Sequence, residues 1–390
     1  MQPNTIPRLP ALLCFAGLLA LVVTLLATPL AAKLAEKAGA VAIPRDRDVH
    51  DHPTPRWGGL ALLLGFLVSV GGIAAACLVL PRASLNEATL EQGAGIVLGG
   101  LVISFVGAID DRKELSPVPR LLGQIAASLV AYALGVRVNF ISLPITGSHN
   151  THLLAGPVTV FWMLLIMNAI NWLDGLDGLA AGVCTIITVF LAVIAIANRQ
   201  PCLALLCAAL AGSTIGFLRY NYSPARIYMG GGAEFLGFVL AAVSIVGAFK
   251  QVTTVAVIIP ILALAVPIFD SVHVVFRRAA SGEPVYQADR RHLHHVLVDM
   301  GLSKKQAVLV LYVITIALCL CAWAIFQHTP RPHRHRIVHT LLPAHAIIPV
   351  HPIHAVPAGL PSVPSPPGTP RIPRAAGDPA GAPRKPGAAS

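Results

Sequence analysis

Charged residues are scarce in this chain of 390 residues, of which they make up only 12%. They supply about a quarter of an ordinary soluble domain. Hydrophobic residues reach 55%, and the mean hydropathy is +0.73. This composition excludes a soluble globular enzyme and predicts an integral membrane protein with many spans.

Cysteine patterns typical of metal or haem sites are also lacking. All seven cysteines lie in apolar runs, so we interpret them as small packing residues. Acidic residues are fewer than basic ones, 17 against 28, which gives a net charge of +11. The last 64 residues contribute seven basic residues and one acidic residue, or +6 of that total. Basic residues in the loops between spans explain the remaining +5, so the charge does not require a nucleic-acid partner.

Ten apolar segments are long enough to cross a bilayer, which takes about 20 residues with some tolerance. In hydrocarbon each of them must be helical, because no water pairs with the backbone. The predicted fold class is therefore an all-α polytopic transmembrane bundle. The first segment is too long for the core of a signal peptide, so we expect it to be a span. The ten predicted spans are 9–31, 58–80, 92–109, 121–137, 156–173, 179–198, 201–218, 235–249, 252–272 and 307–326.

Basic residues alternate strongly between successive loops. One set of loops carries sixteen Lys and Arg residues, and the opposite set, with the C-terminal tail excluded, carries five. The positive-inside rule places the sixteen in the cytoplasm. The same loops contain nearly every polar cluster, which favours a site at the cytoplasmic face over a channel through the membrane.

The sequence predicts two parts, a membrane domain over 1–326 and a tail over 327–390. The tail contains 15 of the 32 prolines and seven of the 15 histidines. We expect this Pro-, His- and Arg-rich segment to be disordered and to lack a function.

A polar stretch, 168–182, separates two apolar runs. Asn168, Asn171 and Asp174 recur every third residue, so a continuing helix would group them on one side. Asp174 and Asp177 are each followed by a glycine, which allows a ligand to approach the backbone. A plain turn between spans needs one or two polar residues, whereas this stretch has four. We therefore favour a functional site.

Adjacent carboxylates, Asp110 and Asp111, follow another span. An ordinary helix end would explain them alone. If the bundle is compact, however, they converge with Asp174 and Asp177, and such a set suits Mg²⁺, which prefers oxygen ligands and substrate phosphates. Together with a basic patch, this predicts phosphoryl-group transfer.

The basic patch includes Arg290, His292, His294 and His295. These side chains suit phosphate oxygens, to which they can donate charge-assisted hydrogen bonds. A Zn²⁺ site is the alternative, but no cysteine lies nearby and spacings of one and two residues do not share a helix face. A positive-inside anchor would explain the arginine but not three histidines.

Six motifs occur in order across residues 45–305 and resemble the polyprenyl-phosphate N-acetylhexosamine-1-phosphate transferases. The form of the histidine motif is more similar to the branch that uses UDP-GlcNAc than to the phospho-MurNAc-pentapeptide translocases, which remain the alternative within the fold. A transporter or an inactive scaffold is the alternative from another class. The motifs are 53–59, 110–114, 168–182, 225–230, 267–270 and 289–301.

The resemblance implies that undecaprenyl phosphate attacks a UDP-sugar at the inner membrane of a bacterium, releasing UMP and starting cell-envelope glycan synthesis. By motif match, Asp110 and Asp111 would be catalytic, activating the lipid phosphate or binding the metal. The implied metal is Mg²⁺ or Mn²⁺, with Asp111, Asn171 and Asp177 as ligands. The implied substrate-binding residues are Asn168, Asp174, Asp177, Arg290, His292, His294 and His295.

Two departures from the family pattern stand out. Family members read Met-Gly-Asp-x-Gly where this chain has three glycines, Gly230 to Gly232, so a metal-binding aspartate is absent. The nearest carboxylate, Glu234, comes several positions late. This loss predicts an impaired enzyme that an inserted aspartate would improve. The second departure is the proline-rich tail, which stands where the branch usually has one more span.

Overall fold

A computed structural model describes residues 9–42, 53–79, 87–143, 147–248, 254–282 and 292–328. These residues all belong to one compact unit. The predicted tail, 327–390, lies outside the described residues from position 329 onward, so its boundary and disorder stay predictions.

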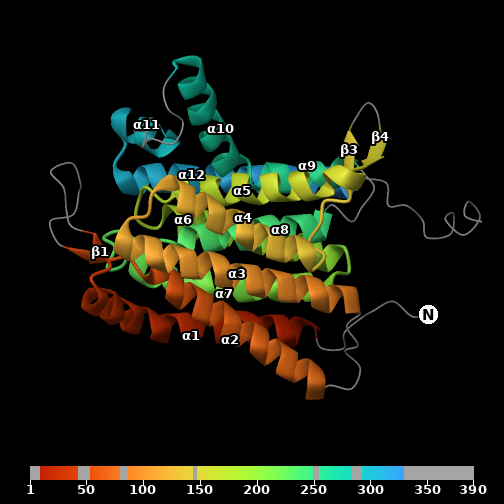
Figure 1. The fold of residues 1–390 in the computed structure, drawn as a ribbon, viewed down its shortest axis with the longest axis horizontal. Helices are drawn as coiled ribbons and strands as arrows, with labels where there is room; N and C mark the ends of the chain where they lie inside the picture. The colour runs from red at the N-terminus through yellow and green to blue at the C-terminus, as the bar shows by residue number, and fades with distance from the viewer. Residues whose placement is uncertain are drawn as a thin grey trace, which may run out of the picture. The chain divides into compact units, whose positions relative to one another are not determined.

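The described chain is almost entirely helical, which confirms the predicted fold class (Figure 1). Each of the ten apolar segments coincides with helix, as expected for chain that must satisfy its own backbone groups in hydrocarbon. The helices are α1 (Leu9–Ala38), α2 (Gly58–Val79), α3 (Glu87–Lys113), α4 (Pro117–Ala133), α5 (Ala155–Leu173), α6 (Leu179–Ala197), α7 (Pro201–Asn221), α8 (Gly232–Ala248), α9 (Thr254–Ala263), α10 (Ala265–Ala280), α11 (Leu293–Asp299) and α12 (Lys304–His328).

Seven of the described helices are long and apolar enough to cross a membrane: α1, α2, α3, α5, α6, α7 and α12. Helix α8 is also apolar but shorter. Exposed leucines and phenylalanines on the outer helices, such as Leu18, Leu26 and Phe105, suit contact with lipid. The protein is therefore a multi-pass membrane protein.

The ninth predicted span, 252–272, is wrong as a single helix. Helix α9 ends at Ala263 and α10 begins at Ala265. Pro267 has no N–H to donate to the carbonyl group four residues earlier, at Ala263, and proline rings crowd the preceding turn. The break lets α10 leave the direction of its neighbours (Figure 1).

Helix α8 lies at the centre of the bundle. From Gly232 to Gly247 every residue except Val246 is buried. It packs against α5 and α3, while α1, α2 and α7 pack together, and α12 packs against α6 and α9. Helix α8 begins at Gly232, the last residue of the glycine run, so the bundle core fixes the place of this run.

Two small antiparallel ribbons and a short 3₁₀ turn complete the described fold. Strand β1 (Val41–Ala42) pairs with β2 (Thr54–Pro55), and β3 (Phe140–Leu143) pairs with β4 (Gly147–Asn150) before the turn η1 (His152–Leu154). The β2 strand leads into α2 beside the 225–231 loop, because Tyr228 N–H donates to the Pro55 carbonyl group (2.8 Å).

Candidate active site

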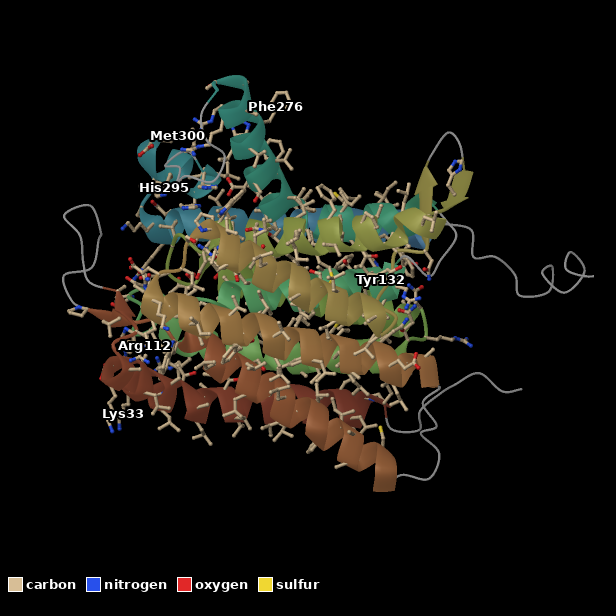
Figure 2. All side chains as sticks on the ribbon, viewed as in Figure 1. Lys33, Arg112, Tyr132, Phe276, His295 and Met300 are labelled. Carbon is tan, nitrogen blue, oxygen red and sulfur yellow. The ribbon has the colours of Figure 1, made fainter. Side chains whose placement is uncertain are left out.

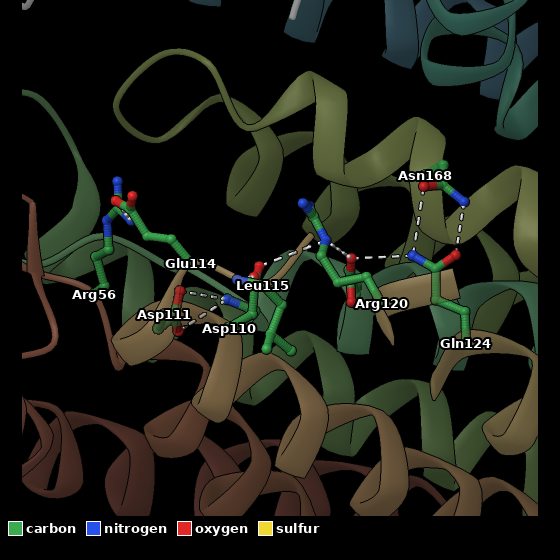
Figure 3. Close-up of polar contacts among 10 residues, drawn as sticks. Arg56, Asp110, Asp111, Glu114, Leu115, Arg120, Gln124 and Asn168 are labelled. Carbon is green, nitrogen blue, oxygen red and sulfur yellow. Dashed lines mark hydrogen bonds and ion pairs between the residues drawn. The ribbon is translucent and has the colours of Figure 1, made fainter. Parts of the chain in front are cut away.

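The two adjacent aspartates lie in the last turn of α3, which extends beyond the predicted span. The Oδ1 atom of Asp110 accepts a hydrogen bond from Leu115 N (2.8 Å), and its Oδ2 atom lies 3.5 Å from Arg120 Nε. Both carboxylate oxygens of Asp111 accept from Gly231 N, at 3.2 and 3.1 Å. The helix end thus connects to two other segments through its carboxylates (Figure 3).

Glycine is required where the 225–231 loop meets α3. Gly230 has φ +58°, and a Cβ atom there would collide with the Asp111 carboxylate and the Arg56 carbonyl oxygen. A Cβ atom on Gly231 would collide with the backbone of Gly107. The glycines therefore allow the loop backbone to approach α3, and they bring the Gly231 N–H to the carboxylate of Asp111.

A buried polar network links α3 to α5 and includes two residues, Arg120 and Gln124, that were not predicted from the sequence. Glu234, only 2% exposed, accepts from Gln124 Nε2 (3.0 Å) and Arg120 Nε (3.4 Å) through Oε1. Asn168 Nδ2 donates to Gln124 Oε1 (2.9 Å). The network therefore runs from Asp110 through Arg120 to Asn168. Polar side chains four apart in an apolar helix, Arg120 and Gln124, were the available signal.

The Asp174 turn begins where α5 ends, at Leu173. Asp174 therefore does not continue the helix face of Asn168 and Asn171, since the Asp-Gly pairs that follow favour a turn. Burial raises the pKa of the Asp174 carboxyl group to about 7, and the nearby charge of Asp177 adds to the rise. The Oδ2 atom of Asp177 accepts from Ala225 N (3.0 Å).

The histidine motif packs against this turn. His294 is 1% exposed, and neither of its ring nitrogens has a hydrogen-bond partner among the described residues. A Cβ atom on Gly175 would collide with its ring. Burial lowers the pKa of His294 to about 4, as does the charge of His295, while Asp270 opposes the change. The first histidine of the motif, His292, stacks on His294 with ring centroids 5.8 Å apart. Arg290 lies outside the described residues.

One loop connects the two aspartate pairs of the site. The 225–231 loop donates Ala225 N–H to Asp177 at its start and Gly231 N–H to Asp111 at its end. Arg112, beside the α3 aspartates, and His295 lie at the same end of the bundle as Lys33, whereas Tyr132 lies at the other end (Figure 2). The structure therefore brings both aspartate pairs and the histidines to one end.

A ready-made metal cluster is not part of this arrangement. Within the described ranges, no three His, Cys, Asp or Glu side chains come together as metal ligands. In the part of the chain that the structure describes, the buried Oε2 atom of Glu234 has no hydrogen-bond partner, although the charge of Glu234 interacts with those of Asp110 and Asp111. This oxygen-rich donor set, with one buried oxygen left unpaired, fits the chemistry of a hard divalent cation.

Known proteins with similar sequences support the resemblance. Residues 94–248 match the model of glycosyl transferase family 4. The probable undecaprenyl-phosphate N-acetylglucosaminyl 1-phosphate transferase of Bacillus subtilis is 36% identical over 79% of this chain and 83% of its own length. The decaprenyl-phosphate N-acetylglucosaminephosphotransferase of Mycobacterium leprae is 34% identical over 77% of this chain and 80% of its own length.

A more distant relative is the undecaprenyl-phosphate alpha-N-acetylglucosaminyl 1-phosphate transferase of Escherichia coli K12, 28% identical over 75% of this chain and 77% of its own length. These relatives match over most of their own length, and the residues matched by the family model include both aspartate pairs. The chain therefore belongs to glycosyl transferase family 4, as an enzyme of the polyprenyl-phosphate N-acetylhexosamine-1-phosphate transferase type.

Proposed function

We propose that this protein transfers N-acetylglucosamine-1-phosphate from UDP-GlcNAc to a polyprenyl phosphate such as undecaprenyl phosphate, releasing UMP. The names of the similar proteins support this substrate pair. The observation that carries the proposal is the 225–231 loop, which is bonded at its two ends to Asp177 and Asp111. Carboxylates from α3 and from the α5–α6 turn therefore lie at the same end of the bundle as the histidines (Figure 2).

In the proposed reaction an oxygen of the lipid phosphate attacks the sugar-linked phosphorus, and the bond from this phosphorus to the bridging oxygen breaks. Asp110 and Asp111 orient the attacking phosphate or accept its proton. Asn168, Asp174 and Asp177 orient the nucleotide, while Arg290, His292, His294 and His295 bind the diphosphate. Positioning and charge neutralisation perform most of the catalysis in such transfers.

A divalent cation, Mg²⁺ or Mn²⁺, would be held by Asp111, Asn171 and Asp177. When bound, it neutralises charge on the phosphate oxygens. The absence of the family aspartate beside Gly231 removes one negative charge from this set, so we expect lower activity than in relatives that have it. Glu234 is the nearest carboxylate along the chain, and its Oε2 atom, unpaired among the described residues, supports a partial replacement.

The proposed location is the bacterial inner membrane, with the active site at the cytoplasmic face. The distribution of basic residues supports this orientation, because Lys33, Arg112 and the histidine motif share one end of the bundle (Figure 2). The membrane transferase domain would be 1–326, with 327–390 as an appended tail. The product would start the synthesis of a cell-envelope glycan.

The test is a transfer assay with purified protein, radiolabelled UDP-GlcNAc and undecaprenyl phosphate. We expect UMP and a labelled lipid, both dependent on Mg²⁺ or Mn²⁺. Asp111→Asn removes the charge but keeps the shape, and it should lower turnover at least 100-fold, since a transition-state charge contact contributes several kcal/mol. Lipid product from UDP-MurNAc-pentapeptide, with none from UDP-GlcNAc, would instead identify the translocase.

A further inference from the structure

Asp270, on α10, is a buried carboxylate to which the proposed reaction assigns no role. Its side chain is 2% exposed. A buried carboxylate is costly unless its oxygens are paired. The Oδ1 atom of Asp270 accepts from Leu293 N (2.6 Å), and Oδ2 lies 2.9 Å from His292 Nδ1. Both oxygens therefore connect α10 to the first residues of the histidine motif.

These contacts fix the ring of His292. Since the carboxylate can only accept, Nδ1 carries the proton and Nε2 is the nitrogen directed away from Asp270. The ring is also held by His294, nearly parallel at 6°, and by Trp172, whose ring centroid lies 6.1 Å away. Among the described residues Nε2 has no hydrogen-bond partner, and it is not one of the fully buried unpaired atoms.

The neighbouring histidine, His294, is not oriented in this way by any carboxylate that the structure describes. His294 is buried against Gly175, and its low pKa, caused by burial, keeps it neutral at pH 7. Asp270 has no comparable contact with it among the described residues. Of these two histidines, therefore, only His292 has a ring that the Asp270 carboxylate orients.

We propose that Asp270 is a positioning residue for the transfer reaction: it holds His292 through Nδ1 so that Nε2 donates a hydrogen bond to the diphosphate of the sugar nucleotide. This inference rests on the proposed function. Donation from both nitrogens at once requires the doubly protonated ring. His292 stays protonated throughout, while the new phosphorus–oxygen bond forms and UMP leaves with the electron pair of the broken bond.

Three variants separate positioning from support of the fold. In His292→Asn the amide nitrogen occupies the place of Nδ1, so the contact with Asp270 remains but the Nε2 donor is lost. In His292→Gln the amide reaches the place of Nε2, but the contact with Asp270 is lost. Asp270→Asn removes the charge that orients the ring. His273→Asn is the matched control, because His273 is exposed on the same helix.

We expect His292→Asn to melt near the parent temperature but to lose about 10- to 100-fold in kcat, as expected for a charge-assisted hydrogen bond. Asp270→Asn should lose a similar factor in kcat with little change in the KM for polyprenyl phosphate. In the His292→Gln background, Asp270→Asn should cause no further loss in kcat. The control should match the parent.

Two results would overturn the inference: parental kcat in His292→Asn, or an equal kcat loss from Asp270→Asn with and without His292→Gln. The second result would show that Asp270 acts only through the fold. If the parent transfers no sugar phosphate, the proposed function fails, and binding then decides the inference. UDP-GlcNAc should raise the melting temperature of the parent and the control but not of Asp270→Asn or His292→Asn, and equal shifts would overturn it.

Discussion

Gly175 offers a sharp test of the contact between the Asp174 turn and the histidine motif. Its φ is not in the left-handed region, so Gly175→Ala adds no backbone strain and by itself favours folding by about 0.4–1 kcal/mol. The added methyl group, however, meets the buried ring of His294. Overpacking of this kind costs about 1–3 kcal/mol, so we expect a net destabilisation of roughly 1 kcal/mol.

The kinetic effect should exceed the effect on stability. Displacing the His294 ring disturbs its stacking with His292, and a loss of about 1.4 kcal/mol in substrate binding raises the KM for UDP-GlcNAc about tenfold. The assays are a thermal melt in detergent and steady-state kinetics of UMP release. Gly71→Ala is the matched control: nothing lies within 4 Å of its added Cβ atom, so it should stabilise α2 by up to about 1 kcal/mol.

A double variant tests whether the effect of Gly175→Ala arises from its contact with His294. Adding His294→Ala to Gly175→Ala removes the ring that the methyl group meets, so the two changes should destabilise the protein less than the sum of their separate effects. Purely additive effects, or parental melting temperature and KM in Gly175→Ala, would show that the turn and the motif do not pack as described.

The remaining predictions concern the network, pH and the missing aspartate. Gln124→Leu leaves the buried carboxylate of Glu234 without its amide donor, so it should lower the free energy of unfolding by about 2–3 kcal/mol, and an unchanged melting temperature would contradict the network. Because folding lowers the pKa of His294 from 6.5 to about 4, the folded state binds fewer protons in this window. Stability should therefore decrease as pH falls from 6.5 to 4, by up to about 3 kcal/mol, and His294→Phe should flatten the melting curve against pH. Inserting Asp between Gly230 and Gly231 should raise transfer activity sharply; no change in kcat would reject the idea that the missing charge limits this enzyme.

The spans were predictable because a backbone in hydrocarbon must form its own hydrogen bonds, which requires a helix. The described part of each apolar segment is mostly helical, and the positions of most helix ends agree within a few residues. The exception is the segment 252–272, where hydropathy is uninterrupted but Pro267 breaks the backbone ladder. Hydropathy measures side chains only, so it could not show this break.

The grouping of the acidic residues at one end of the bundle was predictable from the sequence, but their hydrogen-bond partners were not. Adjacent carboxylates and Asp-Gly pairs stand out in an apolar chain, whereas Gln124 and Glu234 meet across 110 positions of sequence. Nor could spacing distinguish His292, which contacts Asp270, from His294, which is buried against a glycine. Such differences arise from how α10, α11 and the Asp174 turn meet, and this depends on tertiary packing.

The central claim is that one end of the bundle transfers a sugar phosphate to lipid at the cytoplasmic face. The most direct measurement is transfer from UDP-GlcNAc, which does not cross the bilayer, added to sealed bacterial membrane vesicles of known orientation. Labelled lipid in inside-out vesicles, with almost none in right-side-out vesicles or with Asp111→Asn, is the predicted result. Equal labelling in right-side-out vesicles, or none in either, would contradict the account.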